Sequence, residues 1–263
     1  MRAPRIYAIA DAATLGEPLE TNLPQAVTAM AEAGVRWIQL RAKPKPPAEP
    51  YPDRRLYDLL AVTLEALDGS GCELWIDDRV DLTAMFANAA LPVAGVHLGQ
   101  NDLPPAAARR VIGDEVRIGL STHTEAQVAA AADDPDVDVV AVGPVFATDS
   151  KSNPDPVVGL ELVRTARRIL KETARERDGR AKILVAIGGI GPQRVAGVLE
   201  AGADSVAVLS AACRGPVAEN CRKLVAAAEA WDSGETTDPE TPEAAVSDAD
   251  AGADADPGDG ESA

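Results

Sequence analysis

The chain has 263 residues, is 46% hydrophobic and carries a net charge of −17, so it holds enough apolar material for one sizeable core. Eleven acidic residues and no basic ones lie between Asp232 and Ala263, which leaves residues 1–231 with a net charge of only −6. A mildly acidic body argues against non-specific nucleic-acid binding, which needs a basic face, and the sequence contains no apolar run of about 18 residues that would predict a membrane span.

Cysteine usage gives an expectation for the cellular location. The three cysteines, Cys72, Cys213 and Cys221, show neither paired nor CxxC spacing, which is typical of a protein in a reducing compartment. The apolar run at 6–10 is too short for a signal peptide and meets Asp11 at once. We therefore expect a cytoplasmic protein.

From residue 6 onward, apolar runs typical of strands alternate with Ala-rich helical patterns. The predicted strands span 6–10, 36–41, 73–77, 95–99, 117–121, 139–145, 183–188 and 205–210. The predicted helices span 22–33, 54–68, 79–88, 104–112, 124–132, 159–177, 192–200 and 216–231. Each helix follows a strand, which indicates parallel strands joined by crossover helices.

Eight such units in about 225 residues are the size of a (β/α)8 TIM barrel. The alternative is an open doubly wound sheet, which usually has fewer units and a glycine-rich turn after its first strand. Here the first strand runs into Asp11-Ala12-Ala13-Thr14-Leu15-Gly16, without a GxGxxG pattern, so the barrel is favoured. We predict a single α/β barrel domain over 1–231 and a disordered acidic tail over 232–263. The five prolines within 44–52 predict an extended loop, either a flap over a pocket or a stiff surface insertion.

The second predicted strand has an unusual alternation. Its Gln39, Arg41 and Lys43 share one face and its apolar residues share the other, because successive side chains of a strand point to opposite sides. This pattern alone has two possible explanations. The strand could lie at a sheet edge with a solvated polar face, or its hydrogen-bond donors and cationic side chains could point into a pocket.

Functional groups of such barrels lie at the carboxyl ends of the strands and on the loops that follow. These positions hold a set of mostly polar residues, which the barrel would place at one mouth. They are Gln39, Arg41, Lys43, Asp77, Asp78, Asp102, Ser121, His123, Thr148, Asp149, Ser150, Lys151, Gly188, Gly189, Leu209 and Ser210.

Two of these groups have a clear chemical interpretation. Asp78 and Asp102 follow neighbouring strands and could hold Mg²⁺, which binds through one or two carboxylates together with water and phosphate. A helix cap is the alternative for Asp77 or Asp78, but a cap needs only one acid. The Gly188-Gly189 pair, with Pro192 after it, predicts either a tight turn or a phosphate cradle made by backbone N–H groups.

Arg41, Lys43 and Lys151 supply cations for a second anionic group, and a diphosphate bridged by the metal fits this set. The expected partners are therefore two phosphorylated small molecules. Neither a Cys nucleophile nor zinc-ligand spacing is present in the sequence. His97 fits a packed core histidine, whereas His123 could reach the mouth as a proton carrier.

Six motifs occur in order at successive strand ends, and together they resemble the thiamine phosphate synthase family over about residues 5–213. They are Gln39–Lys43, Asp77–Asp81, Gly95–Asp102, Gly119–His123, Gly143–Lys151 and Ala186–Ile190. The resemblance implies a (β/α)8 transferase that joins 4-amino-5-hydroxymethyl-2-methylpyrimidine diphosphate to a thiazole phosphate and releases diphosphate. It also implies a dissociative reaction, in which diphosphate leaves before the thiazole nitrogen attacks.

The resemblance further implies residue roles. Positions matching the pyrimidine diphosphate site are Gln39, Arg41, Lys43, Asp77, Ser121 and Lys151, of which Arg41, Lys43, Ser121 and Lys151 are the expected catalytic residues. Positions matching the Mg²⁺ ligands are Asp78 and Asp102. Positions matching the thiazole phosphate site are Thr148, Asp149, Ser150, Gly189, Leu209 and Ser210.

One departure from the family is Asp77, where Asn is usual, because a carboxylate adds negative charge beside a diphosphate and cannot donate as an amide does. Two alternative functions follow. A thiazole tautomerase of similar sequence would lack the cationic second strand and the Gln100-x-Asp102 pair, both present here. The second alternative is a non-catalytic binder of thiamine intermediates. In such a protein, Asp77 in place of Asn would indicate that the catalytic activity has been lost. A homo-oligomer is compatible with either alternative and with the synthase.

Overall fold

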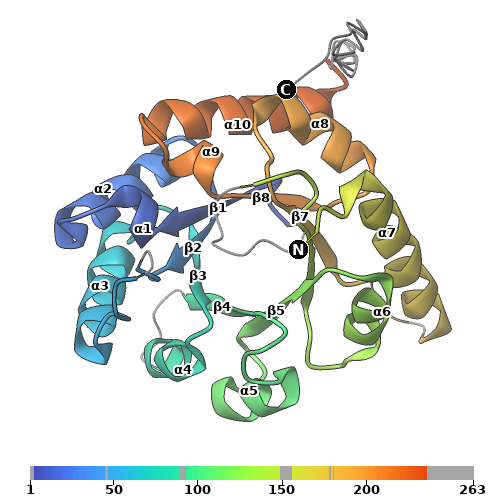
Figure 1. Cartoon of the computed structure of the whole chain (residues 1–263), viewed down its shortest axis with the longest axis horizontal. Coiled ribbons are helices and arrows are strands. Elements are labelled where there is room, and N and C mark those ends of the chain that lie inside the picture. The colour runs from blue at the N-terminus through green and yellow to red at the C-terminus, as the bar shows by residue number, and fades with distance from the viewer. Residues whose placement is uncertain are drawn as a thin grey trace, which may run out of the picture.

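A closed barrel of eight parallel strands forms the centre of the molecule. The computed structural model describes residues 3–44, 47–88, 93–148, 156–177, 179 and 181–235. Each strand pairs with the next one in the sequence, and β8 pairs with β1 to close the ring. Figure 1 shows the strands encircled by helices. The predicted (β/α)8 architecture is confirmed.

The strands agree closely with the predicted ones. They are β1 (Ile6–Asp11), β2 (Trp37–Arg41), β3 (Glu73–Asp77), β4 (Val93–Leu98), β5 (Arg117–Thr122), β6 (Val139–Val142), β7 (Ile183–Ile187) and β8 (Ser205–Val208). The helices are α1 (Ala12–Leu15), α2 (Leu19–Glu32), α3 (Asp53–Ala66), α4 (Val80–Asn88), α5 (Pro105–Ile112), α6 (Glu125–Asp133), α7 (Gly159–Glu176), α8 (Pro192–Glu200), α9 (Ser210–Cys213) and α10 (Val217–Ser233).

Several boundaries differ from the prediction by a few residues, and three of them have a clear physical reason. Helix α2 begins at Leu19 and contains Pro24, because the full burial of Leu19 and Leu23 outweighs the hydrogen bond that proline removes. Strand β6 ends before Pro144, which has no N–H for the ladder. Strand β8 ends at Val208, because the following residues form the short helix α9.

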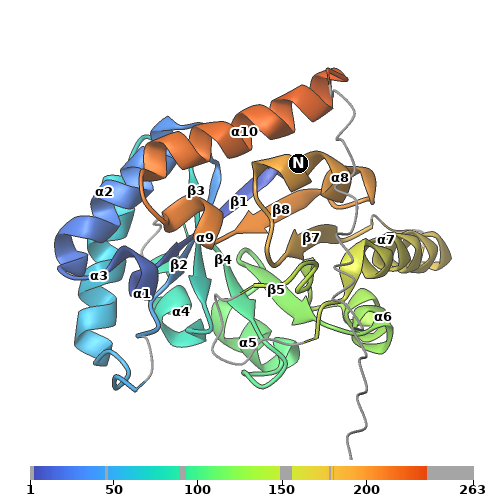
Figure 2. The ribbon, with the colours of Figure 1, turned by 45° about the horizontal axis from the view of Figure 1, so that its top comes forward.

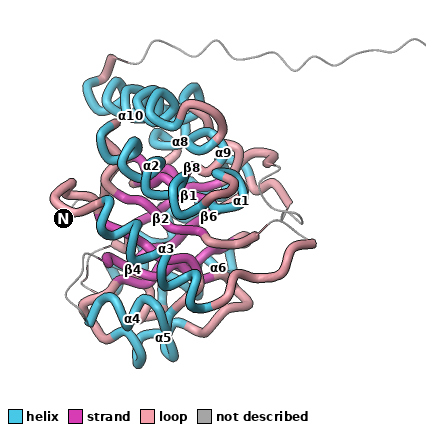
Figure 3. Tube along the Cα trace, turned by 90° about the vertical axis from the view of Figure 1, so that its left-hand side faces the viewer, coloured by secondary structure: helices cyan, strands magenta, loops and turns pink. Residues whose placement is uncertain are grey.

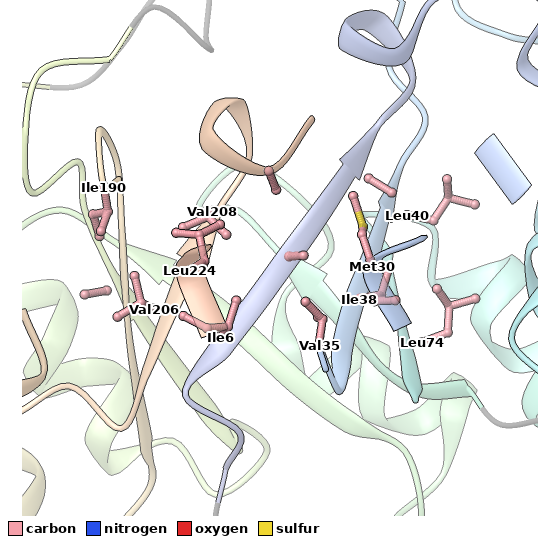
Figure 4. Packing of buried hydrophobic residues seen from close by; sticks show 14 of the residues in the cluster. Ile6, Met30, Val35, Ile38, Leu40, Leu74, Ile190, Val206, Val208 and Leu224 are labelled. Atoms are coloured by element: carbon pink, nitrogen blue, oxygen red, sulfur yellow. The ribbon is translucent and has the colours of Figure 1, made fainter. Parts of the chain in front are cut away.

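The alternation in β2 separates the two sides of the barrel wall. Ile38 and Leu40 face outward, where Figure 4 shows them close to Met30 of α2 and to Leu74 of β3. Gln39 and Arg41 face inward and line the cavity at the carboxyl end of the barrel. The pocket interpretation of the second strand is therefore correct.

Aromatic rings fill the interior of the barrel below this cavity. Tyr7, Trp37 and Trp75 pack against one another in edge-on and tilted arrangements, with ring centroids 5.1–5.7 Å apart. Gly95 leaves room for them, because a Cβ there would lie 2.5 Å from the Trp75 ring. Arg117 lies over both tryptophans at 5.1 and 5.2 Å and pairs with Glu73 at 2.5 Å. This floor leaves the carboxyl end of the barrel as the open end.

The last helix, α10, lies beside α8, as Figures 2 and 3 show from two directions. It continues past the predicted domain boundary at 231, because Asp232 accepts hydrogen bonds from Arg5 at 2.8–3.2 Å and Arg5 also stacks on Trp231 at 4.6 Å. Of the predicted tail, only residues 232–235 are described. Among the described helices, none combines the length and apolarity of a membrane span.

Candidate active site

A cavity of about 880 Å³ opens at the carboxyl end of the barrel. Eleven of the fourteen residues to which the resemblance assigns a role line it: Gln39, Arg41, Lys43, Asp77, Asp78, Asp102, Ser121, Thr148, Gly189, Leu209 and Ser210. The other three, Asp149, Ser150 and Lys151, lie outside the described residues. The structure thus brings together, in one cavity, every predicted site residue that it describes.

The amide of Gln39 is a buried polar group in the cavity wall. Its Nε2 donates to the hydroxyl of Tyr7 at 2.8 Å. Burial raises the pKa of Tyr7 well above its usual value, so the phenol stays neutral. The contact fixes which way the amide nitrogen points and leaves the amide oxygen as the acceptor end of Gln39.

Arg41, the next inward residue of β2, lies between two carboxylates. Its Nη1 is 2.5 Å from Oδ1 of Asp11, and its Nε is 3.7 Å from Oδ2 of Asp77. The guanidinium is about four-fifths buried, with 20% of the side chain exposed. A buried guanidinium held from two sides keeps one orientation, which suits bidentate binding of a phosphate.

Lys43 bridges the two adjacent acids that follow β3. Its Nζ lies 3.0 Å from Asp77 and 2.5 Å from Asp78. Burial lowers the pKa of the Lys43 ammonium, but the two carboxylates outweigh this effect and the pKa is raised overall. Both acids therefore have a partner outside α4, and Lys43 is held charged at the mouth.

The negative charge of Asp77 is offset by Lys43 and Arg41. Arg79 could have done so from its place in the sequence, but it pairs instead with Asp81 at 2.6 Å and with Asp53 at 3.0 Å. The unusual acid is thus neutralised by the same two cations that the resemblance assigns to the diphosphate.

Asp78 has two features that set it apart. Its φ of 60° lies in the left-handed region, and no other non-glycine residue in the described part of the chain has a positive φ. Such strain, on the order of 1 kcal/mol, concentrates at functional positions. Burial raises the pKa of Asp78 to about 6, and the nearby Asp77 and Asp102 add to the rise.

Asp78 and Asp102 form a chemically suitable pair for a hard cation. Asp102 is anchored by the N–H of Gly99, which donates to Oδ2 at 2.7 Å. The described residues contain no cluster of three or more His, Cys, Asp or Glu side chains placed for a metal. Two carboxylates fit Mg²⁺, which keeps several waters and often takes substrate phosphate oxygens as ligands. A bound cation would stabilise the charged form of Asp78, which burial and the repulsion by Asp77 and Asp102 disfavour.

On the neighbouring strand β5, Ser121 is positioned by β4 and the loop after it. Its Oγ lies 2.9 Å from Nε2 of His97, and its carbonyl accepts from Nε2 of Gln100 at 2.6 Å. His97 thus lies in the cavity wall rather than in the packed core alone. His123 reaches the mouth, as expected, and its Nδ1 lies 2.6 Å from the Gly143 carbonyl.

The Gly188-Gly189 turn is locked against the loop that follows β6. The N–H of Phe146 donates to the Gly188 carbonyl at 3.0 Å, and a Cβ at Gly189 would lie 2.4 Å from the Ala147 carbonyl oxygen. Arg194 donates to the Gly189 carbonyl at 2.6 Å and stacks over Phe146 at 4.3 Å. Helix α8 starts directly after the turn, so its first N–H groups face the end of the barrel that holds the cavity.

Three contacts to the site were missed from the sequence: Tyr7, Asp11 and Arg194. Asp11 carries a usable signal, since it stands at the carboxyl end of the first strand, where the other site residues were found. Tyr7 and Arg194 carry none, because one looks like an aromatic core residue and the other like a surface residue of a helix.

The fold and the cavity together are typical of (β/α)8-barrel enzymes. The mouth of this barrel combines cationic side chains, carboxylates from the ends of two strands and a glycine turn. Residues 6–212 match the model of the family described as thiamine monophosphate synthase. The chain is 39% identical over 211 residues to the thiamine-phosphate synthase of Koribacter versatilis, covering 80% of this chain and 89% of that one. It is 40% identical over 212 residues to that of Acidothermus cellulolyticus, covering 79% and 90%.

A comparison with solved structures gives the same family and the same fold. A thiamine phosphate pyrophosphorylase from Pyrococcus furiosus superposes with a TM-score of 0.67 at 26% identity, covering 86% of this chain and 96% of that chain. A tryptophan synthase α-subunit from the same organism, at 16% identity and a TM-score of 0.58, shares the fold alone. The chain belongs to the thiamine monophosphate synthase family and is a transferase enzyme of thiamine biosynthesis.

Proposed function

We propose that the chain condenses 4-amino-5-hydroxymethyl-2-methylpyrimidine diphosphate with 4-methyl-5-(2-phosphoethyl)thiazole to give thiamine phosphate and diphosphate. The observation that carries this proposal is the pairing of two anion-binding arrangements in one cavity. Arg41 and Lys43 lie beside Asp78 and Asp102 on one wall, and the Gly188-Gly189 turn precedes α8 on another.

The charge at the mouth supports a metal requirement. Among the described residues that line the cavity, the Lys and Arg side chains are Arg41 and Lys43, and the carboxylates are Asp77, Asp78 and Asp102. The carboxylates outnumber these cations by one, and Lys151 as a third cation would only balance the count, so no positive charge would be left over to offset a diphosphate. Mg²⁺ held by Asp78 and Asp102 would supply the missing positive charge to the diphosphate oxygens.

We assign the following roles to the chain's own residues. Gln39 and Ser121 hold the pyrimidine, and Arg41, Lys43 and Lys151 bind the diphosphate and stabilise the charge that grows on it as the C–O bond breaks. The Gly189 turn, with Thr148, Asp149, Ser150, Leu209 and Ser210, places the thiazole phosphate so that its ring nitrogen forms the new C–N bond. No general base is needed, because the attacking nitrogen carries no proton.

The test is a product assay on the purified protein with both substrates and Mg²⁺. We expect thiamine phosphate and diphosphate in equal amounts, which would be measured by chromatography and by a coupled diphosphate assay. Isomerisation of the thiazole without diphosphate release would instead identify a tautomerase. Binding of the thiazole phosphate without any turnover would identify a non-catalytic binder.

A further inference from the structure

Asp11 stands behind Arg41 and is one of the most deeply buried acids of the described chain, with 3% of the residue exposed. The parallel register of β1 and β2 places Asp11 directly beside Arg41. Its Oδ1 contacts Nη1 of Arg41 at 2.5 Å. None of the roles assigned above uses this carboxylate.

The other oxygen of Asp11 is fixed by the chain that follows it. Oδ2 accepts from the backbone N–H of Thr14 at 3.1 Å and from the Thr14 hydroxyl at 2.7 Å, so Asp11 caps the short helix α1. With one oxygen held by α1, the other is aimed at Arg41 in a single direction. The carboxylate is therefore rigid before any ligand arrives.

An isolated helix cap does not explain this arrangement. A cap requires only one oxygen, and serine, threonine or asparagine serves equally well without burying a charge. A buried carboxylate is costly unless it is paired, and here its pair is the predicted diphosphate-binding guanidinium.

We propose that Asp11 is a positioning residue, which holds the Arg41 guanidinium in the orientation that binds the diphosphate. The contact occupies Nη1 from behind and leaves other N–H groups of the fork available for phosphate oxygens. This inference rests on the proposed function, because it assumes that Arg41 binds diphosphate.

The matched variants are Asp11→Asn and Asp11→Ser, which both retain a capping side chain and remove the charge. We expect kcat/KM for the pyrimidine diphosphate to fall by about tenfold or more, since small misplacement of a binding group is costly in rate. The KM for the thiazole phosphate should stay within about twofold, whereas general damage to the barrel would raise both. In an Arg41→Ala background, Asp11→Asn should cause no further loss, because its effect passes through Arg41.

Asp138→Asn is the control. Asp138 also pairs with an arginine, Arg109, at 2.8 Å and accepts from a backbone N–H, but it precedes β6 at the other end of the barrel. We expect it to lower Tm without changing kcat/KM.

A binding measurement separates this inference from the proposed function. Calorimetric titration with inorganic diphosphate and Mg²⁺ needs no turnover, and we expect at least about tenfold weaker binding to Asp11→Asn than to the wild type. A wild type that binds diphosphate but forms no thiamine phosphate would contradict the proposed function only. Unchanged or tighter diphosphate binding in both Asp11 variants, or a loss that adds fully to that of Arg41→Ala, would overturn the role of Asp11.

Discussion

At the scale of single residues, each described cation at the mouth of the barrel contacts two carboxylates at once. Asp77 and Asp78 share Lys43, and Asp11 and Asp77 share Arg41. Arg41 and Lys43, two of the three cations that the proposed function assigns to the diphosphate, are already paired with protein carboxylates. A ligand must compete with Asp77 and Asp78, which line the cavity, whereas Asp11 lies outside the lining and holds the orientation of Arg41.

Asp77→Asn tests the cost of this competition. The amide removes one negative charge close to the diphosphate and frees Lys43 and Arg41 from one partner. We expect KM for the pyrimidine diphosphate to fall by about fivefold, the size of one partly screened charge interaction at contact distance. Steady-state kinetics measure it, and a KM that rises would show that the carboxylate itself binds substrate.

Asp78 gives a pH dependence whose sign follows from its pKa. The folded, metal-free protein holds the Asp78 proton up to about pH 6, whereas an ordinary Asp in the unfolded chain loses it near 3.8. Ionisation therefore lowers stability as pH rises between these two values. We predict that Asp78→Asn in EDTA is more stable than the wild type by about 1–3 kcal/mol at about pH 8.

The same comparison near pH 4 is the control, because Asp78 is then largely protonated in the folded wild type and the advantage of Asn should shrink toward zero. Thermal unfolding at both pH values measures the difference. An advantage of equal size at both values would mean that the gain comes from packing rather than from the charge.

At the scale of elements, the eight strands were predictable because their apolar runs are buried on the outer side by helices and punctuated by turns. The two short helices α1 and α9 were not predictable, since four residues carry no periodic pattern and such helices depend on tertiary contacts. Asp11 depends on α1 for its orientation, so the pairing with Arg41 could not be deduced from the sequence. The alternation in β2, by contrast, was enough to place Gln39 and Arg41 on the inner face.

The loops after β6 and β7 form a joined element through Arg194, which contacts Gly189 and Phe146 together. Arg194→Ala should loosen the turn that we assign to the thiazole phosphate. We expect KM for this substrate to rise by about three- to tenfold, with the KM of the pyrimidine diphosphate nearly unchanged. Arg168→Ala, which removes an exposed arginine of α7, is the matched control and should change neither constant.

At the scale of the whole molecule, the last helix of the barrel domain extends to Ser233, beyond the point where the acidic composition of the chain begins. The acidic stretch begins at Asp232, but Arg5 joins Trp231 and Asp232 to the start of β1. A chain ending at Glu235 should therefore match the full chain in Tm and kcat. A chain ending at Ala230 should melt about 3–8 °C lower, since it loses the stacking and the ion pair.

Differential scanning calorimetry of the two truncated chains measures this difference. Equal Tm values for the two would show that α10 is held by its apolar face alone. A clear loss in the chain ending at Glu235 would show that residues after it contact the barrel.

The central proposal is that the cavity binds diphosphate together with Mg²⁺, and it is supported by the excess of carboxylates over cations among the described lining residues. The most direct measurement is calorimetric titration of the wild-type protein with inorganic diphosphate, in Mg²⁺ and in EDTA. We predict binding in Mg²⁺ that weakens by about 100-fold or more in EDTA and in the double variant Asp78→Asn, Asp102→Asn. Equally tight binding in EDTA, or in the double variant, would contradict it.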